Sequence, residues 1–228
     1  MMRSVATVLF LGGLTFLLLV ITNSLNFGQP PMLIGEAIRY AAPENVGAGN
    51  LVTAVVLGYR GLDTLGELSI LFAAATAGGL VLGTAHSRAK QASGFILRTG
   101  ADLMFPLLLV VGLYIVIHGH LTPGGGFQGG VVLAAAFFLP LLARPGESLN
   151  HSLLSVVEGL AGAAFIGIGV YALAQGEAFL TPLFDKGVLG ELVSSGSLPL
   201  LYLAVGLKVG SELASLLMRL AGDDEVTS

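Results

Sequence analysis

The chain has 228 residues, of which 54% are hydrophobic and only 11% are charged, and its mean hydropathy is +0.89. Soluble domains carry about 25% charged residues, so this composition excludes an ordinary soluble protein and indicates a chain embedded mostly in a lipid bilayer. The net charge of −4 argues against nucleic-acid binding, and the absence of cysteine excludes disulfides, iron–sulfur ligation and thiol catalysis within this chain.

Six apolar segments are long enough to cross a bilayer, which takes about 20 residues in a helix. We therefore expect an all-α membrane protein with spans near residues 4–22, 63–85, 99–118, 127–143, 152–175 and 196–220. The first segment is long for the apolar core of a signal peptide, and no small-x-small cleavage site follows it. It is therefore expected to be a retained helix.

A polar connector occupies residues 23–63 and contains the helix-breaking sequence NFGQPP at 26–31. Residues 36–40 are expected to form a short surface helix. The apolar run LVTAVVLGY at 51–59 is too short to span, so it is either interfacial or re-entrant.

Basic residues are distributed unequally between the two sides of this layout. With the N-terminus inside, six of them face the cytoplasm and three face outward. The inner set is Arg3, Arg88, Lys90, Arg98, Arg144 and Arg219, and the outer set is Arg39, Arg60 and Lys186. This asymmetry follows the positive-inside rule, so both termini are expected in the cytoplasm.

A glycine-rich turn, HGHLTPGGGFQGG, joins the third and fourth spans at residues 118–130. Proline fixes φ, whereas glycine adopts backbone angles closed to other residues. Irregular backbone inside a membrane persists only where it is buried in protein or lines a wet cavity, so this turn is either a tight packing corner or part of a polar path. The glycines at 124, 126 and 129 also fit G-x-G-x-x-G. A dinucleotide site is excluded, because it requires a βαβ unit and this turn follows an apolar span instead.

The stretch GHLTPGGGFQGG, with an apolar helix on each side, resembles the hallmark of the B subunit of Mrp-type multisubunit sodium/proton antiporters. The related subunit of membrane-bound hydrogenase-type complexes carries it too. The resemblance covers about residues 94–220 and includes EAFLT at 177–181 and LYLAVGLKVG at 201–210. The motif residues are Pro123, Gly124, Gly125, Gly126, Phe127, Gln128, Gly129 and Gly130.

This resemblance implies a non-enzymatic subunit of a hetero-oligomeric antiporter in a prokaryotic cell membrane, with Na⁺ and H⁺ as the transported ions and no cofactor. The alternative is the same subunit within a redox-driven complex, where hydrogenase-like partners supply electrons. Two other classes fit less well. A self-sufficient permease often shows an internal repeat, and an intramembrane metalloprotease needs a motif such as H-E-x-x-H; neither occurs in this sequence.

The segment NLVTAVVLGYRGLDTLGE at 50–67 is similar to the small E-type subunit of the hydrogenase complexes. The same pattern occurs in the C-terminal extension of the large antiporter A subunit. The chain therefore resembles a fusion of two modules. We expect a two-helix E-type module at 1–92 and a four-helix module resembling the B subunit at 93–228.

Few ionisable residues fall inside the predicted spans, where each costs about 2.5–3.5 kcal/mol near the bilayer centre. Lys208 lies midway along the last span, and Glu212 lies one turn further on the same helix face. This pair either locks helices together or takes part in a proton or ion relay. Glu158, in the fifth span, must face protein or water, for packing or for an ion path.

Asp63 and Glu67 share one face of the second span and either stabilise the helix start or attract a cation at the mouth of a path; the similarity at 50–67 favours the second role. Asp102 is expected to cap the third span. His118 and His120 diverge by about 200° on a helix and cannot chelate one ion together. We therefore expect no metal site, which leaves an interfacial structural role or proton handling.

Overall fold

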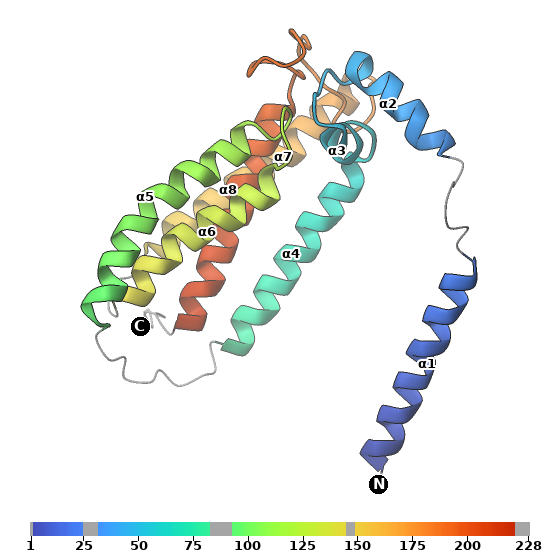
Figure 1. Ribbon diagram of the computed structural model, residues 1–228. Helices are drawn as coiled ribbons and strands as arrows, with labels where there is room; N and C mark the ends of the chain where they lie inside the picture. The colour runs from blue at the N-terminus through green and yellow to red at the C-terminus, as the bar shows by residue number, and fades with distance from the viewer. Residues whose placement is uncertain (1, 25–31, 83–92, 145–148, 222–228) are drawn as a thin grey trace. The chain divides into compact units, whose positions relative to one another are not determined.

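The computed structural model describes residues 2–24, 32–82, 93–144 and 149–221 (Figure 1). These residues form helices and no strand, and six of the helices are long and apolar enough to cross a membrane. The six are α1 (Met2–Ser24), α4 (Gly61–Leu82), α5 (Phe95–Ile117), α6 (Gly126–Ala143), α7 (His151–Ala174) and α8 (Leu198–Ala221). The predicted all-α fold with six spans is confirmed, and each predicted boundary lies within about four residues of the observed one.

The chain divides into two compact units, residues 1–38 and 39–228. The first unit holds α1 and the beginning of α2 (Leu33–Asn45). After Arg3, α1 has no acidic or basic residue, which is typical of a helix surrounded by lipid or by other apolar helices. The predicted boundary between the two modules, at residue 92, lies outside the described residues.

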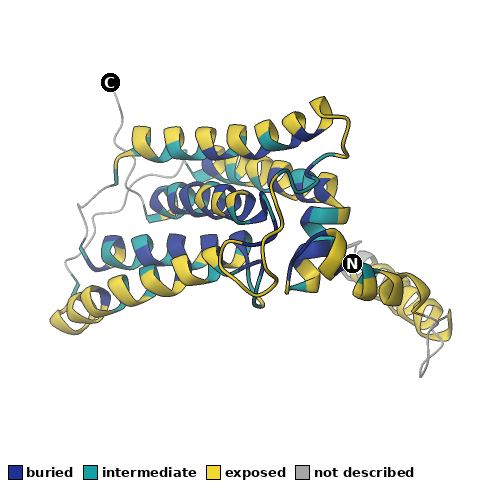
Figure 2. Ribbon diagram, turned by 90° about the horizontal axis from the view of Figure 1, so that it is seen from above, coloured by how far each residue is buried: buried dark blue, intermediate teal, exposed yellow. Residues whose placement is uncertain are grey.

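Helix α8 forms the core of the second unit, because it contacts α4, α5, α6 and α7. It is also the most buried of the six spans, as the dark helix near the middle of the bundle in Figure 2 shows. Helix α6 packs against both α5 and α8, whereas α7 lies against α8.

Glycines of the motif bring α6 close to both of its neighbours. A Cβ on Gly126 would lie 2.5 Å from Cβ of Val205 on α8, and one on Gly129 would lie 2.4 Å from Cγ2 of Val116 on α5. A Cβ on Gly130 would come within 2.8 Å of a side chain of α8. Small residues allow this close approach of helix backbones in lipid, so no larger residue fits at these three positions.

The turn before α6 is a tight packing corner. Gly124 and Gly125 have φ angles of 146° and 133°, a region that residues with a side chain rarely adopt. A Cβ on Gly125 would also lie 2.5 Å from Cε1 of Tyr202. Both the backbone angle and the neighbouring ring therefore require glycine at position 125.

The connector before α4 holds this corner through side-chain hydrogen bonds. Nδ2 of Asn50 donates to the carbonyl oxygens of Gly119 and Thr122, each at 2.9 Å. The Thr53 hydroxyl donates to the same Gly119 oxygen at 2.7 Å and lies 2.5 Å from the Tyr202 hydroxyl. The predicted apolar run is thus helical, as α3 (Leu51–Thr53) and the π-helix η1 (Ala54–Tyr59), and its N-terminal end packs on the corner.

The loop between α7 and α8 joins the same region. Its Ser195 hydroxyl donates to the Gly47 carbonyl at 2.7 Å, and Nζ of Lys186 donates to the Glu44 carbonyl at 2.9 Å. Residues 42–60, 118–125 and 175–197 therefore meet at one end of the bundle (Figure 1), and we call them the loop layer.

His120 is completely buried in the loop layer. Neither ring nitrogen reaches hydrogen-bond geometry with any described residue. This burial lowers the pKa of His120 from its usual value of 6.5, although the nearby backbone of Glu191 and Leu192 opposes the shift and His118 adds slightly to it. His120 is therefore neutral in the folded chain at neutral pH.

Valine at Gly126 or Gly129 is expected to destabilise the protein by about 1–3 kcal/mol, the usual cost of overpacking. The control is Gly167→Val, because a Cβ on Gly167 meets no atom within 4 Å. Thermal unfolding in mild detergent measures the effect. Equal melting temperatures for Gly126→Val, Gly129→Val and the control would show that the close packing of α6 is unimportant.

The buried histidine should make the fold sensitive to acid. Folding lowers the pKa of His120. Below about pH 6.5 the imidazole therefore binds a proton in the unfolded chain but stays neutral in the folded chain. The free energy of unfolding is therefore unaffected by His120 above this pH and declines as the pH falls below it. Melting temperatures measured between pH 8 and pH 5 should fall less steeply for His120→Gln than for the wild type, and identical slopes would contradict this role.

Candidate functional site

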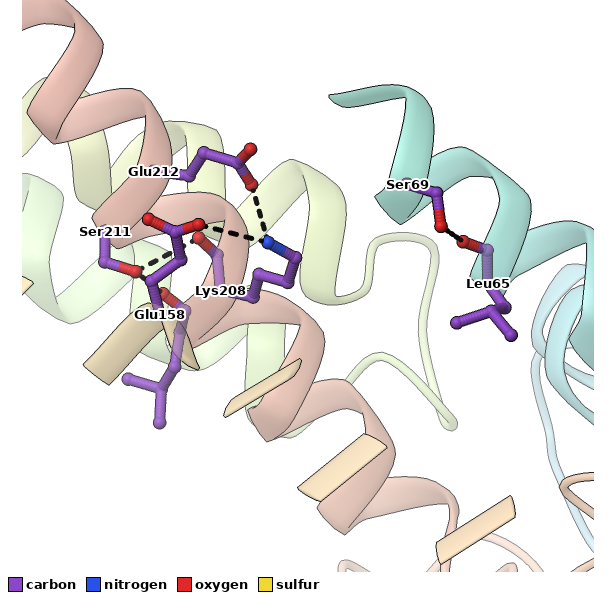
Figure 3. A network of polar contacts seen from close by, with 7 residues as sticks. Leu65, Ser69, Glu158, Lys208, Ser211 and Glu212 are labelled. Carbon is purple, nitrogen blue, oxygen red and sulfur yellow. Dashed lines mark hydrogen bonds and ion pairs between the residues drawn. The ribbon is translucent and has the colours of Figure 1, made fainter. Parts of the chain in front are cut away.

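Three ionisable side chains meet where α7 faces α8 (Figure 3). Nζ of Lys208 donates to Oε2 of Glu212 at 3.1 Å and to Oε1 of Glu158 at 3.4 Å. We call Glu158, Lys208 and Glu212 the charge cluster. The structure brings these three predicted residues together, whereas the sequence alone had paired only Lys208 with Glu212.

Helical spacing on both helices produces this arrangement. Lys208 and Glu212 are four residues apart on α8 and therefore share one face. Glu158 and Gly162 are likewise four apart on α7, and a Cβ on Gly162 would make an ordinary van der Waals contact with Cδ of Lys208, at 3.5 Å. Gly162 therefore lies against the aliphatic stem of Lys208, whose ammonium group reaches Glu158.

The cluster has more negative than positive groups. Two carboxylates share one ammonium group, and the exposed side-chain fractions are 12% for Lys208, 20% for Glu158 and 3% for Glu212. Oε1 of Glu212 has no hydrogen-bond partner among the described residues. A buried acceptor without a partner costs about 1–3 kcal/mol, and more when it is charged, so this oxygen is suited to accept a proton or a small cation.

Phe72 of α4 completes the site, and sequence reasoning missed it. Its ring centroid lies 5.1 Å from Nζ of Lys208, a distance typical of a cation–π contact. A phenylalanine within an apolar span gives no signal that separates this role from ordinary packing. The contact places α4, from the predicted first module, beside the charge cluster.

Asp63 and Glu67 do not join the charge cluster. Asp63 lies in the first turn of α4 and pairs with Arg60, and both side chains are largely exposed. Glu67 is exposed, and its side chain makes no ion pair within the described part of the chain. The two carboxylates therefore lie on α4 apart from the ammonium group of Lys208.

The expectation that Asp102 caps a helix is wrong. Helix α5 begins at Phe95 after the N-cap Gly94, because the apolar residues 95–97 continue the helix toward the N-terminus. Asp102 consequently lies two turns inside α5, where its carboxylate pairs with Arg144 beyond the end of α6.

The two histidines occupy different environments in the loop layer. His118 is the C-cap of α5, and its ring stacks on Tyr114 with the ring centroids 4.1 Å apart. Nδ1 of His118 lies 3.0 Å from the Tyr114 carbonyl oxygen, whereas His120 is buried without a hydrogen bond. Among the described residues, no group of three or more His, Asp or Glu side chains could hold a metal ion.

Comparison with known proteins shows relatives of several kinds. A protein of Methanocaldococcus jannaschii is 31% identical over 189 residues, which cover 70% of this chain and 72% of the relative. A Staphylococcus aureus protein named antiporter subunit mnhB2 is 34% identical over 106 residues, which cover 46% of this chain and 71% of that protein.

Two solved structures resemble the whole chain. A chain of the membrane-bound sulfane sulfur reductase, an archaeal respiratory membrane complex, matches with a TM-score of 0.83 and 38% identity, covering 97% of this chain and 99% of that one. A chain of the Mrp complex from Dietzia sp. DQ12-45-1b matches with a TM-score of 0.73 and 25% identity, covering 98% of this chain and 26% of the longer one.

The family model described as a domain related to the MnhB subunit of Na⁺/H⁺ antiporters matches residues 96–215. That range is more than half of the 228 residues and agrees with the range expected from the glycine-rich motif. The chain therefore belongs to the family of domains related to the MnhB subunit of Na⁺/H⁺ antiporters.

Proposed function

We propose that this protein is a membrane subunit of an Mrp-type multisubunit Na⁺/H⁺ antiporter, and that its charge cluster lies on the ion-translocation path. The observation that carries the second part is the geometry of Lys208, which is held between two carboxylates while one oxygen of Glu212 stays free. The subunit works in a hetero-oligomer with other antiporter subunits in the prokaryotic cell membrane. Its role is transport rather than enzymatic catalysis.

The chemistry of the cluster fits ion movement better than a simple helix lock. A lock needs one carboxylate for one ammonium group, and it leaves no buried oxygen without a partner. The second carboxylate gives the site an excess negative charge when both are ionised, and a monovalent cation or proton neutralises it. Such intramembrane charges commonly mark ion and proton pathways.

A redox-driven host complex is the second candidate. The match to the archaeal sulfane sulfur reductase complex covers nearly all of both chains, so this domain arrangement also occurs in a respiratory membrane complex. The charge cluster would serve ion translocation in either host, with electrons handled by other subunits. Identification of the proteins that co-purify in mild detergent separates the two hosts.

We also propose that both termini face the cytoplasm, so that the loop layer faces outward. The asymmetry of basic residues supports this orientation, although Arg88 and Lys90 lie outside the described residues. The division into modules at 1–92 and 93–228 remains a proposal as well. It is supported by the start of the family match at residue 96.

The subunit role is tested by transport in proteoliposomes. The assembled complex should exchange Na⁺ for H⁺, whereas the purified chain alone should not, because one charge cluster does not supply a complete path for two ions. Sodium-dependent acidification followed with a fluorescent pH dye measures exchange. Robust exchange by the single chain would instead identify a self-sufficient transporter.

Lys208→Arg separates a relay from a lock. Arginine keeps the positive charge and forms ion pairs, but it does not release its proton at physiological pH. If Lys208 acts in a relay, the Lys208→Arg complex should assemble normally and lose most of its Na⁺/H⁺ exchange, by tenfold or more if a proton step is blocked. Assembly is measured by co-purification of the other subunits. An intact Lys208→Arg complex with wild-type exchange would restrict Lys208 to a structural role.

A further inference from the structure

A cavity of about 680 Å³, open at the surface of the described chain, borders the charge cluster among α4, α7 and α8. Glu158 and Glu212 line it, and Oε1 of Glu212 is the oxygen without a partner. The remaining polar lining comes from Thr76, Ser152, Ser155, Ser215, His151 and Arg219. This concentration of polar side chains is unusual for a space between membrane-spanning helices.

The cavity extends to the end of the bundle opposite the loop layer. His151 is the first residue of α7, Arg219 lies in the last turn of α8, and Gly79 lies in the last turn of α4. Glu158 follows His151 by seven residues, which is about 10 Å along a helix. The cavity therefore leads from the helix ends to the charge cluster.

Phe72, whose side chain is half exposed, lies at the end of this cavity that borders Lys208. A second cavity of about 190 Å³ lies beyond it, lined by Lys208 and mainly by apolar groups such as Leu65, Leu68 and Phe165. Phe72 lines both cavities, and its ring covers the ammonium group of Lys208. Water occupies polar cavities, whereas apolar ones stay dry. A space with polar walls and a mainly apolar one therefore meet at Phe72.

Lipid chains would not satisfy the hydrogen-bonding groups that line the larger cavity. Oε1 of Glu212 and Nε2 of His151 both lack a hydrogen-bond partner among the described residues, and hydrocarbon offers none. The volume accommodates more than ten water molecules at roughly 30 Å³ each. Water in the cavity would satisfy both groups, and it would let a hydrated cation reach the carboxylate without losing its shell in hydrocarbon.

We propose that this cavity is an aqueous vestibule that admits a small monovalent cation from the cytoplasmic end to Oε1 of Glu212, and that Phe72 over Lys208 closes its inner end. The assignment of the cation rests on the proposed antiport function and on the proposed orientation. The cation is hydronium or sodium, the two ions of the proposed antiport, and either one neutralises the excess carboxylate of the charge cluster.

Cysteine accessibility in the assembled complex tests the vestibule, because the chain has no other cysteine. Ser155→Cys and Ser215→Cys place thiols in the larger cavity. Gly162→Cys is the matched control. Gly162 lies seven residues from Ser155 on the same face of α7, but it lines the second cavity. A Cβ there makes an ordinary contact with Lys208, at 3.5 Å. A membrane-impermeant trimethylammonium methanethiosulfonate reagent is applied to either side of sealed vesicles.

The vestibule thiols should react from the cytoplasmic side at least about tenfold faster than Gly162→Cys, because the reaction requires a hydrated thiolate. Phe72→Ala should remove most of that difference by admitting water to position 162. Unreactive Ser155→Cys and Ser215→Cys, or reaction from the outside alone, would overturn the vestibule. Equally fast labelling of Gly162→Cys with Phe72 intact would overturn the barrier.

A further measurement identifies the cation. Labelling of Ser215→Cys is compared in sodium chloride and in N-methylglucamine chloride at equal pH and ionic strength. Slower labelling in sodium, absent in Glu212→Gln, assigns sodium to the vestibule, whereas equal rates exclude sodium and leave the proton of the two antiported ions. Labelling does not depend on turnover, so a complex that labels as expected but fails to exchange ions contradicts the transport function and leaves the vestibule intact.

Discussion

The close packing of glycines against Val116, where α5, α6 and α8 meet, is the constraint on which the rest of the second unit depends. Val116 of α5 lies against two glycines, Gly129 of α6 and Gly206 of α8, and a Cβ on either glycine would come within 2.7 Å of it. Burial of apolar surface does not drive helices together in lipid, so close packing of small residues has to do so. The glycine-rich motif therefore fixes the distance between three helices.

The same packing sets the direction in which α8 presents its charges. Gly206 and Gly210 face α5 and α6, whereas Lys208 and Glu212 are each two residues further along the helix. Two residues correspond to a rotation of about 200°, so the charged face points away from the glycine face, toward α7 and α4. Glu158 and Phe72 then meet Lys208 because those two helices cover that side.

Hydropathy and spacing predicted much of this architecture. The six spans follow from apolar length, and the Lys208–Glu212 pair follows from the helical repeat. Glu158 and Phe72 could not be assigned as partners of Lys208, because contacts between helices depend on helix order and rotation, which hydropathy does not encode. Asp102 was misplaced because the start of α5 was assigned too late, after the apolar residues 95–97. His120 could not be recognised as buried, since its environment comes from a loop about 70 residues later in the chain.

The central claim is that the glycine face of α8 directs its charged face toward α7 and α4. A cryo-electron microscopy map of the assembled complex, at a resolution that shows side chains and waters, tests it most directly. The account predicts Val116 seated against Gly129 and Gly206, Lys208 bonded to both Glu158 and Glu212, and ordered water beside Glu212. A map in which Lys208 instead pairs with a carboxylate of another subunit, while Glu158 points away from α8, would contradict it.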